Sequence, residues 1–356
     1  MIVLFHLTYF VQDRFPYYLT IVHYWFGVWV QLFFFISGFS LFYGYFDRLN
    51  DLNGVKKYLV SRFLRIAPLF YTMIVFWSGL LFFTQGVTCS LGEYLINFTF
   101  LFNIIPGMAN SIVPAGWTIG ILFLFYLIVP ILIVVIRKFS VSIVGLAGSI
   151  FVAIFYYDYM STLGGIDWLY NYTSIITQFP FFLAGIVCYF IVKKILAKEE
   201  LLNKIRIKVI GVALIISGIF ITCLITLISP ILIYCSHIPF AIGLLYVWGV
   251  VFICFLIGLI LYPWKGVVNR VSKFLGNISY SIYLVHPVVL LLSIPVYNNI
   301  YEWIGYWDIS FLISFIYTLI ILLVVSFLTY KFIEKPAIKY GKSFILKKIL
   351  KQKFQV

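Results

Sequence analysis

Residues 116–138 read GWTIGILFLFYLIVPILIVVIRK, and no charged side chain occurs before Arg137 and Lys138. A helix that crosses the hydrocarbon core of a bilayer needs about 20 mostly apolar residues, which this stretch provides. The whole chain of 356 residues has the same character, with 64% hydrophobic and only 10% charged residues. A soluble globular domain carries about 25% charged residues. The sequence therefore predicts an all-α, polytopic bundle of transmembrane helices.

We expect about ten spans, of which the first is too short to cross the membrane as it stands. The stretches between the spans are too short to form a soluble core of their own. We therefore predict a single membrane domain over residues 1–342 and a basic cytoplasmic tail over residues 343–356. The predicted spans are 2–12, 22–44, 66–86, 116–136, 140–157, 174–192, 207–228, 238–262, 278–297 and 309–330.

The charged residues predict the topology. Of the 25 Lys and Arg residues, 23 fall in the segments that follow the even-numbered spans, and Lys208 lies in the seventh span next to one of these segments. Only Arg14 lies on the opposite side, together with six of the 11 acidic residues. Loops rich in Lys and Arg stay in the cytoplasm, so both termini should be cytoplasmic. The net charge of +14 thus indicates a multi-pass protein of the cell (inner or plasma) membrane and not a nucleic-acid partner.

Two of the four histidines, His6 and His286, lie inside predicted spans. Ionisable residues within a membrane are functional candidates, although a structural histidine bonded to a backbone carbonyl or a tyrosine explains the pattern equally well. Ser279, Tyr283 and His286 are spaced by four and three residues, which places them on one helix face. A polar stripe of this kind faces protein or a water-filled cavity, so we expect it to line one.

Arg62 and Arg65 stand at the cytoplasmic entry to the third span. They either extend to the interface and meet anionic lipid or hold phosphate groups bidentately, which Arg does better than Lys. At the end of the last span, Glu334 should pair with a basic neighbour, and Pro336 should stop the helix. The five cysteines show no CxxC or metal-ligand spacing, and we predict no metal site.

Six pieces of the sequence, in order along the whole chain, carry a family resemblance. The chain resembles the acyltransferase-3 family of integral-membrane acyltransferases, which move acetyl or other short acyl groups onto hydroxyls of cell-envelope sugars. The resemblance implies that His6 is the catalytic base and that Arg62 and Arg65 engage the acyl-CoA donor. The pieces are VLFHL at 3–7, GVWVQLFFFISGFSLF at 27–42, SRFLRIAPLFY at 61–71, GWTIGILFLFYLIVP at 116–130, LGNISYSIYLVHP at 275–287 and FIEKP at 332–336.

Two departures from the family pattern accompany the resemblance. The family has an arginine eleven residues before the histidine that His6 matches, and this position would fall before Met1. A helix from Met1 to residue 13 rises only about 18 Å, against a hydrocarbon thickness of about 30 Å. We therefore expect either a start upstream of Met1 or a missing family element. At Leu122, many members of the family have Glu.

These observations together predict transfer of an acyl group, expected to be acetyl, from acetyl-CoA to a hydroxyl of an envelope polysaccharide or a lipid-linked sugar. His6 would be the general base, and Arg62 and Arg65 would bind the CoA phosphates. The partners expected are membrane lipid and a sugar acceptor. A transporter or flippase of an envelope glycan or lipid, and a non-catalytic family member, are the alternatives. The residues expected to line the substrate cavity are Ser37, Gly38, Trp117, Ser279, Tyr283 and His286.

Overall fold

The structure is a computed structural model, and it describes residues 1–11, 14–105, 108, 111–163, 168–197, 204–235, 238–341 and 343. Within these residues the chain forms helices and turns, and no β-strand occurs. The predicted tail over residues 343–356 lies outside the described residues, except for residue 343. The histidine at position 237, His237, also lies outside them.

The helices follow the predicted apolar stretches closely. The α-helices are α1 (Ile2–Phe10), α2 (Thr20–Trp25), α3 (Trp29–Tyr45), α4 (Leu52–Gln85), α5 (Leu91–Thr99), α6 (Trp117–Val135), α7 (Phe139–Thr162), α8 (Trp168–Tyr172), α9 (Ile175–Leu196), α10 (Lys204–Cys235), α11 (Ile238–Leu261), α12 (Arg270–Leu292), α13 (Ile294–Ile304) and α14 (Trp307–Thr329). Short 3₁₀ turns occur at Tyr17–Leu19, Phe26–Val28 and Phe102–Ile104, and a π-helical turn covers Tyr330–Glu334.

Eight helices among the described residues are long and apolar enough to cross a membrane. This confirms the prediction of a polytopic α-helical protein. Helix α11 adds a shorter apolar segment over Leu245–Leu261, and α1 has nine residues. The predicted number of ten spans and the cytoplasmic side of both termini stay predictions.

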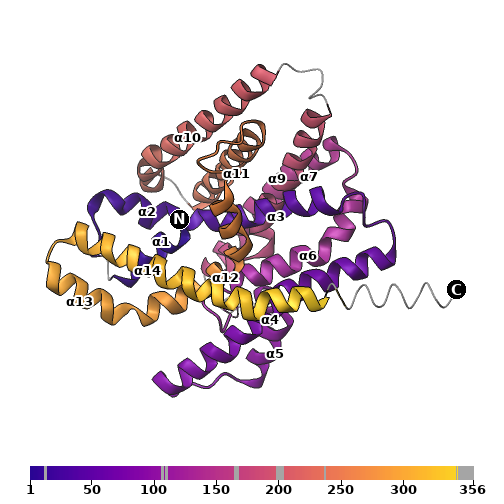
Figure 1. The fold of residues 1–356 in the computed structure, drawn as a ribbon. Helices are drawn as coiled ribbons and strands as arrows, with labels where there is room; N and C mark the ends of the chain where they lie inside the picture. The colour runs from indigo at the N-terminus through magenta and orange to yellow at the C-terminus, as the bar shows by residue number, and fades with distance from the viewer. Residues whose placement is uncertain are drawn as a thin grey trace, which may run out of the picture.

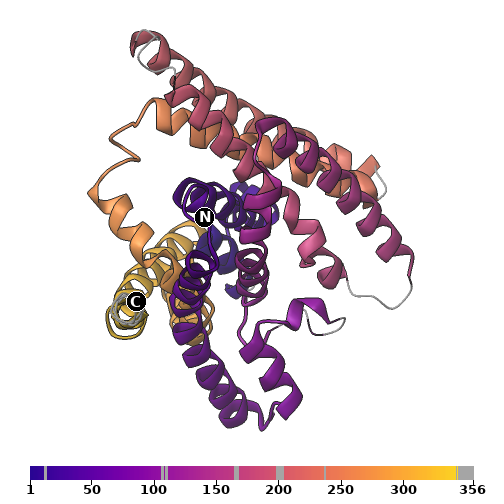
Figure 2. The same ribbon diagram turned by 90° about the vertical axis from the view of Figure 1, so that its right-hand side faces the viewer.

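The helices form two groups with α3 between them (Figures 1 and 2). Helices α7, α9, α10 and α11 pack on one another in the first group, and α4, α6, α12 and α14 make up most of the second. Helix α3 packs against α9 of the first group and α6 of the second. The N-terminus lies near the centre of the molecule in both views, and α1, in which Leu7 and Thr8 are buried, contacts α12.

The contact between α3 and α9 depends on two glycines. A Cβ atom at Gly38 would lie 2.0 Å from the Phe182 carbonyl oxygen, and one at Gly185 would lie 2.0 Å from the Phe35 carbonyl oxygen. Two atoms that are not bonded to each other cannot come as close as 2.0 Å, so only glycine permits this approach of the two helices. Small residues have this role in many membrane helix pairs, because they let the two backbones come close.

The helix that contains the third predicted span begins earlier than that span, because α4 runs without a break over Leu52–Gln85. The prediction for Pro336 is wrong: Pro336 does not stop the last helix, which continues through the π-helical turn Tyr330–Glu334 and remains helical to Gly341. Proline disrupts a regular helix because it lacks an N–H and clashes with the carbonyl of residue i−4. The wider π turn directly before Pro336 alters that hydrogen-bond register, so the helix can continue.

The connection between α4 and α6 packs back against the bundle, as its apolar sequence predicts. Helix α5 begins at a capping box in which Ser90 and Glu93 bond each other's backbone N–H groups. Phe100 and Phe102, which follow it, are fully buried. This connection therefore covers α4 and α6, and it leaves the other side of α6 to face the site.

Candidate functional site

The two intramembrane histidines meet at the centre of the molecule. His6 on α1 and His286 on α12 are 280 positions apart in the sequence, and His286 Nε2 lies 3.2 Å from His6 Nδ1. Their ring centroids are 4.8 Å apart. His286 is completely buried, whereas His6 is partly exposed. The structure therefore joins the predicted catalytic base to a residue that the sequence placed only on a cavity wall.

The partners of the two rings indicate which nitrogens carry protons. His286 Nδ1 lies 2.5 Å from the Tyr283 carbonyl oxygen, which can only accept, so we assign the proton to Nδ1 and a lone pair to Nε2. His6 Nδ1 then has two acceptors beside it, His286 Nε2 and the Ile2 carbonyl oxygen at 3.0 Å. It must therefore be the protonated nitrogen of His6. The remaining nitrogen, His6 Nε2, carries a lone pair and has no hydrogen-bond partner among the described residues.

A cavity of about 560 Å³ reaches His286 from between α3, α12 and α14. Ser279, Tyr283 and His286 all line it, so the three lie on one face of α12 beside a cavity. The rest of its wall is almost entirely apolar and includes Phe33, Leu319 and Leu322. The predicted polar stripe of α12 is therefore a narrow band on an otherwise hydrocarbon-like surface.

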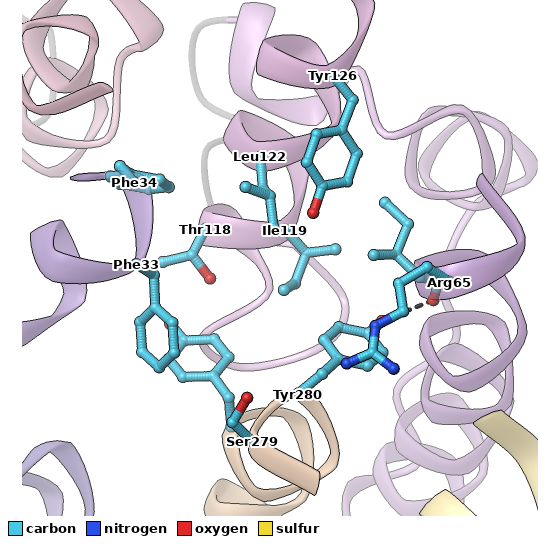
Figure 3. Close-up of a pocket in the computed structure, with 11 residues that line it drawn as sticks. Phe33, Phe34, Arg65, Thr118, Ile119, Leu122, Tyr126, Ser279 and Tyr280 are labelled. Atoms are coloured by element: carbon cyan, nitrogen blue, oxygen red, sulfur yellow. Dashed lines mark hydrogen bonds between the residues drawn. The ribbon is translucent and has the colours of Figure 1, made fainter. Parts of the chain in front are cut away.

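A second, smaller cavity of about 140 Å³ adjoins the first (Figure 3). Phe33, Ser279 and Tyr283 line both cavities, so they form a shared wall. Arg65 lines the second cavity from α4, and Leu122 lines it from α6. Arg65 and His286 thus line two cavities that share one wall.

Arg65 is held by an acid from the other end of the sequence. Its guanidinium forms an ion pair with Glu334, and the second Glu334 oxygen accepts a hydrogen bond of 2.9 Å from the Ser281 hydroxyl. The Glu334 side chain is completely buried. We expected Glu334 to pair with a basic residue near it in the sequence, and this was wrong, because the π turn at the end of α14 turns its side chain toward α4 and α12.

Arg62 lies apart from Arg65, in a cluster of tyrosines. Its guanidinium donates a hydrogen bond of 2.6 Å to the Tyr45 hydroxyl and lies 5.9 Å from the ring centres of Tyr58 and Tyr126. The Arg62 Nε atom is buried and has no hydrogen-bond partner. Arg62 also lines a third cavity, of about 500 Å³, with Tyr126. The two arginines therefore face different cavities, and Tyr126 lies on the wall of both.

Three of the predicted cavity residues have other surroundings. Gly38 lies at the crossing of α3 and α9, and Trp117 packs edge-on against Phe34 and Tyr172. Ser37 hydrogen-bonds with the Tyr126 side chain. None of the three lines the cavities described above. Gly38 thus allows the close approach of α9.

Sequence reasoning missed Tyr126 and Phe33. Both are ordinary members of aromatic-rich spans, and no spacing or motif separates them from the other aromatic residues of this chain. Among the described residues, no group of three His, Cys, Asp or Glu side chains gathers where it could hold a metal ion.

A family of known proteins matches most of this chain. The family described as "Acyltransferase domain", acyltransferase-3, matches residues 1–331. The chain belongs to this acyltransferase family. The match includes the histidine pair, the two arginines and the residues of the two adjoining cavities, whereas Glu334, which pairs with Arg65, lies just beyond its end.

A viral protein is also similar to this chain. The protein named "Putative acetyltransferase ORF330" of Acidianus two-tailed virus is 30% identical to this chain over 269 residues, which are 74% of this chain and 72% of the viral protein. No solved structure matches the chain. Family membership and eight apolar helices together make this a multi-pass membrane protein of an acyltransferase family.

Proposed function

We propose that this protein transfers an acyl group from acyl-CoA to a hydroxyl of an envelope polysaccharide or lipid-linked sugar in the cell membrane, with His6 as the general base. The observation that carries the proposal is the lone pair on His6 Nε2, left by the hydrogen bonds that occupy His6 Nδ1. A general base needs an unprotonated nitrogen in a fixed orientation. The hydrogen bonds of His6 Nδ1 to the Ile2 carbonyl oxygen and His286 Nε2 fix the ring and leave Nε2 unprotonated.

In this mechanism His6 Nε2 takes the proton of the acceptor hydroxyl as that oxygen attacks the thioester carbonyl. The His6 ring becomes positively charged, and its Nδ1–H then faces two acceptors, His286 Nε2 and the Ile2 carbonyl oxygen. Hydrogen bonds to a charged group are roughly twice as strong as neutral ones, so these two contacts stabilise the charged ring. The C–S bond breaks, and the proton passes from His6 to the departing thiolate of CoA.

The basic end of the site suits an anionic donor. Arg62 lines the third cavity and has no acidic partner among the described residues, so its charge is open to an anionic ligand. Arg65 is already paired with Glu334, so its charge is largely neutralised. We therefore assign phosphate binding mainly to Arg62, and we assign Arg65 to the wall of the passage that leads toward the histidines.

The test is consumption of acyl-CoA by the purified protein. Wild-type protein in lipid nanodiscs should release free CoA thiol from acetyl-CoA when a crude envelope glycan fraction is present, and His6→Gln should lower the rate by about 100-fold or more. His23→Gln is the matched control, because His23 lies 2.9 Å from the Thr8 hydroxyl and not beside His286. The control should retain most of the rate.

The outcome separates the alternatives. A transporter or flippase moves its substrate without a stoichiometric release of CoA, and a non-catalytic family member releases none. If no thiol is released by the wild-type protein with acetyl, propionyl or octanoyl donors, acyl transfer from CoA is the wrong function. If thiol is released at equal rates by wild type and His6→Gln, the role of His6 is wrong while acyl transfer stands.

A further inference from the structure

We propose that the 560 Å³ cavity beside His286 binds the alkyl chain of the acyl donor, so that the donor site accepts chains considerably longer than acetyl. The inference rests on the proposed function and narrows its substrate class. It concerns the larger of the two adjoining cavities, whose wall includes Trp29, Ile36, Ile282, Phe315 and Leu323.

The chemistry of the wall selects the ligand. Apart from Ser279, Tyr283, His286 and the main-chain amine of Met1, the lining groups are aliphatic or aromatic. Such a surface offers few partners to the many hydroxyl groups of a sugar or the several charges of a CoA phosphate cluster, and burying unpaired polar groups is costly. An unbranched hydrocarbon chain needs no hydrogen bonds, and it gains free energy with each buried methylene group.

The volume of the cavity is also far larger than an acetyl group requires. The acetyl methyl occupies about as much space as one water molecule, roughly 30 Å³, whereas this cavity measures about 560 Å³. The adjoining cavity of about 140 Å³ suits a narrow passage for the donor. The smaller volume is therefore the one expected of an entry path, and the larger volume is the one expected of a compartment that binds an alkyl chain.

The position of the cavity favours the donor over the acceptor as the source of the chain. Its α12 lining residues run from Leu275 to His286, toward the basic end of α12 that begins at Arg270. It shares Phe33, Ser279 and Tyr283 with the cavity of Arg65. A thioester that passes the shared wall stands beside the histidine pair, and the chain attached to its carbonyl can then extend into the larger cavity.

The cavity offers a position for a sharp test. Gly276 lines it, and a Cβ atom there would meet no atom within 4 Å. A Gly276→Phe substitution thus adds a side chain without a backbone clash and occupies part of the chain compartment. Gly79 on α4 is the matched control, because its Cβ would also meet nothing within 4 Å and it lines none of the three cavities.

The experiment measures binding of acetyl-CoA and octanoyl-CoA to the purified full-length protein in nanodiscs. Octanoyl is six methylene groups longer than acetyl, and each buried methylene adds about fourfold to an affinity. Wild type and Gly79→Phe should bind octanoyl-CoA at least ten times more tightly than acetyl-CoA. Gly276→Phe should bring that ratio to within about twofold of one.

Each other outcome has a distinct meaning. A wild-type ratio near one, with acetyl-CoA bound, overturns the chain site and leaves the proposed function standing. A ratio that survives in Gly276→Phe assigns the preference to another part of the protein and also overturns the inference. Binding of neither thioester contradicts the proposed function as well. If Gly276→Phe only reduces co-purified membrane lipid, the cavity holds a bilayer lipid and the inference is wrong.

Discussion

At the scale of single residues, the site depends on pairs that are distant in the sequence. His6 and His286 orient each other, and Arg65 and Glu334 neutralise each other. Each pair joins a residue of the first quarter of the chain to one near its end. The chemistry of one member is therefore set by the other, and this can be tested one substitution at a time.

His286 should act as a positioning residue for His6. His286→Leu removes the acceptor beside His6 Nδ1, so the His6 ring loses its orientation and the stabilisation of its charged form. We expect kcat for thiol release to fall about 10–100-fold, with the KM for acyl-CoA and the thermal unfolding temperature little changed. His286→Gln retains a carbonyl acceptor and should recover part of kcat. Full activity of His286→Leu would contradict this role.

Glu334 should stabilise the protein through Arg65. Glu334→Ala leaves a partly buried guanidinium without its partner, which we expect to cost about 1–3 kcal/mol of unfolding free energy. The control is Asp47→Ala, since Asp47 and Lys193 are 3.8 Å apart and exposed, and exposed pairs contribute about 0–1 kcal/mol. The measurement is thermal unfolding of the detergent-solubilised protein. Replacing both Arg65 and Glu334 by Met should restore stability above that of Glu334→Ala, and equal stability of both variants would count against the ion pair.

At the scale of helices, close packing and end-capping place the site. Helix α3 supplies Phe33 to the shared wall of the two cavities and is itself positioned by its glycine contact with α9. Helix α5 is fastened at its start by the capping box of Ser90 and Glu93. The glycine contact and the capping box each predict the effect of one substitution.

Gly38→Ala should separate α3 from α9. The Cβ atom of the new alanine would lie 2.0 Å from the Phe182 carbonyl oxygen. This oxygen is a main-chain atom, so the clash is relieved only if the two helices move apart. Overpacking costs about 1–3 kcal/mol, so the unfolding temperature and the yield of folded protein should fall. Gly44→Ala on the same helix meets nothing within 4 Å and should leave both unchanged. Similar behaviour of the two variants would show that this crossing is not tight.

The start of α5 should loosen in acid. The Ser90 backbone N–H donates to the Glu93 carboxylate and lowers the pKa of that carboxyl below its ordinary value of 4.5. A carboxyl with a lower pKa in the folded state stabilises it fully above 4.5, and the contribution is lost as the pH falls through the lowered value. Hydrogen exchange of α5 amides should therefore accelerate below pH 4.5 relative to the ordinary pH dependence. Glu93→Gln should remove this acid-induced change, and its persistence would assign it to another group.

At the scale of the whole molecule, the two helix groups meet at α3, and the N-terminus lies near the centre (Figures 1 and 2). This arrangement brings α1 against α12 and so joins the two histidines. The distribution of Lys and Arg along the sequence predicts how the bundle is oriented in the membrane.

Labelling of single cysteines should establish the topology. In a variant without native cysteines, Tyr306→Cys, at a position that is 72% exposed, should react with a membrane-impermeant maleimide on intact cells. Lys138→Cys, also at an exposed position, should react only after the membrane is permeabilised, because Lys and Arg accumulate on the cytoplasmic side. The reverse pattern would invert the predicted topology.

The sequence by itself determined the class of the fold, most helix positions, the polar face of α12 and the candidate residues His6, Arg62 and Arg65. These follow from local patterns, because a bilayer admits only helices or barrels and an apolar stretch of sufficient length can satisfy its backbone only within itself. Tertiary structure alone decided that His286 is the partner of His6, that Glu334 pairs with Arg65, that Arg62 and Arg65 face separate cavities, and that Gly38 serves a helix crossing. Such pairings depend on which helices become neighbours, and hydrophobic spans of similar composition contain no local signal that specifies their neighbours.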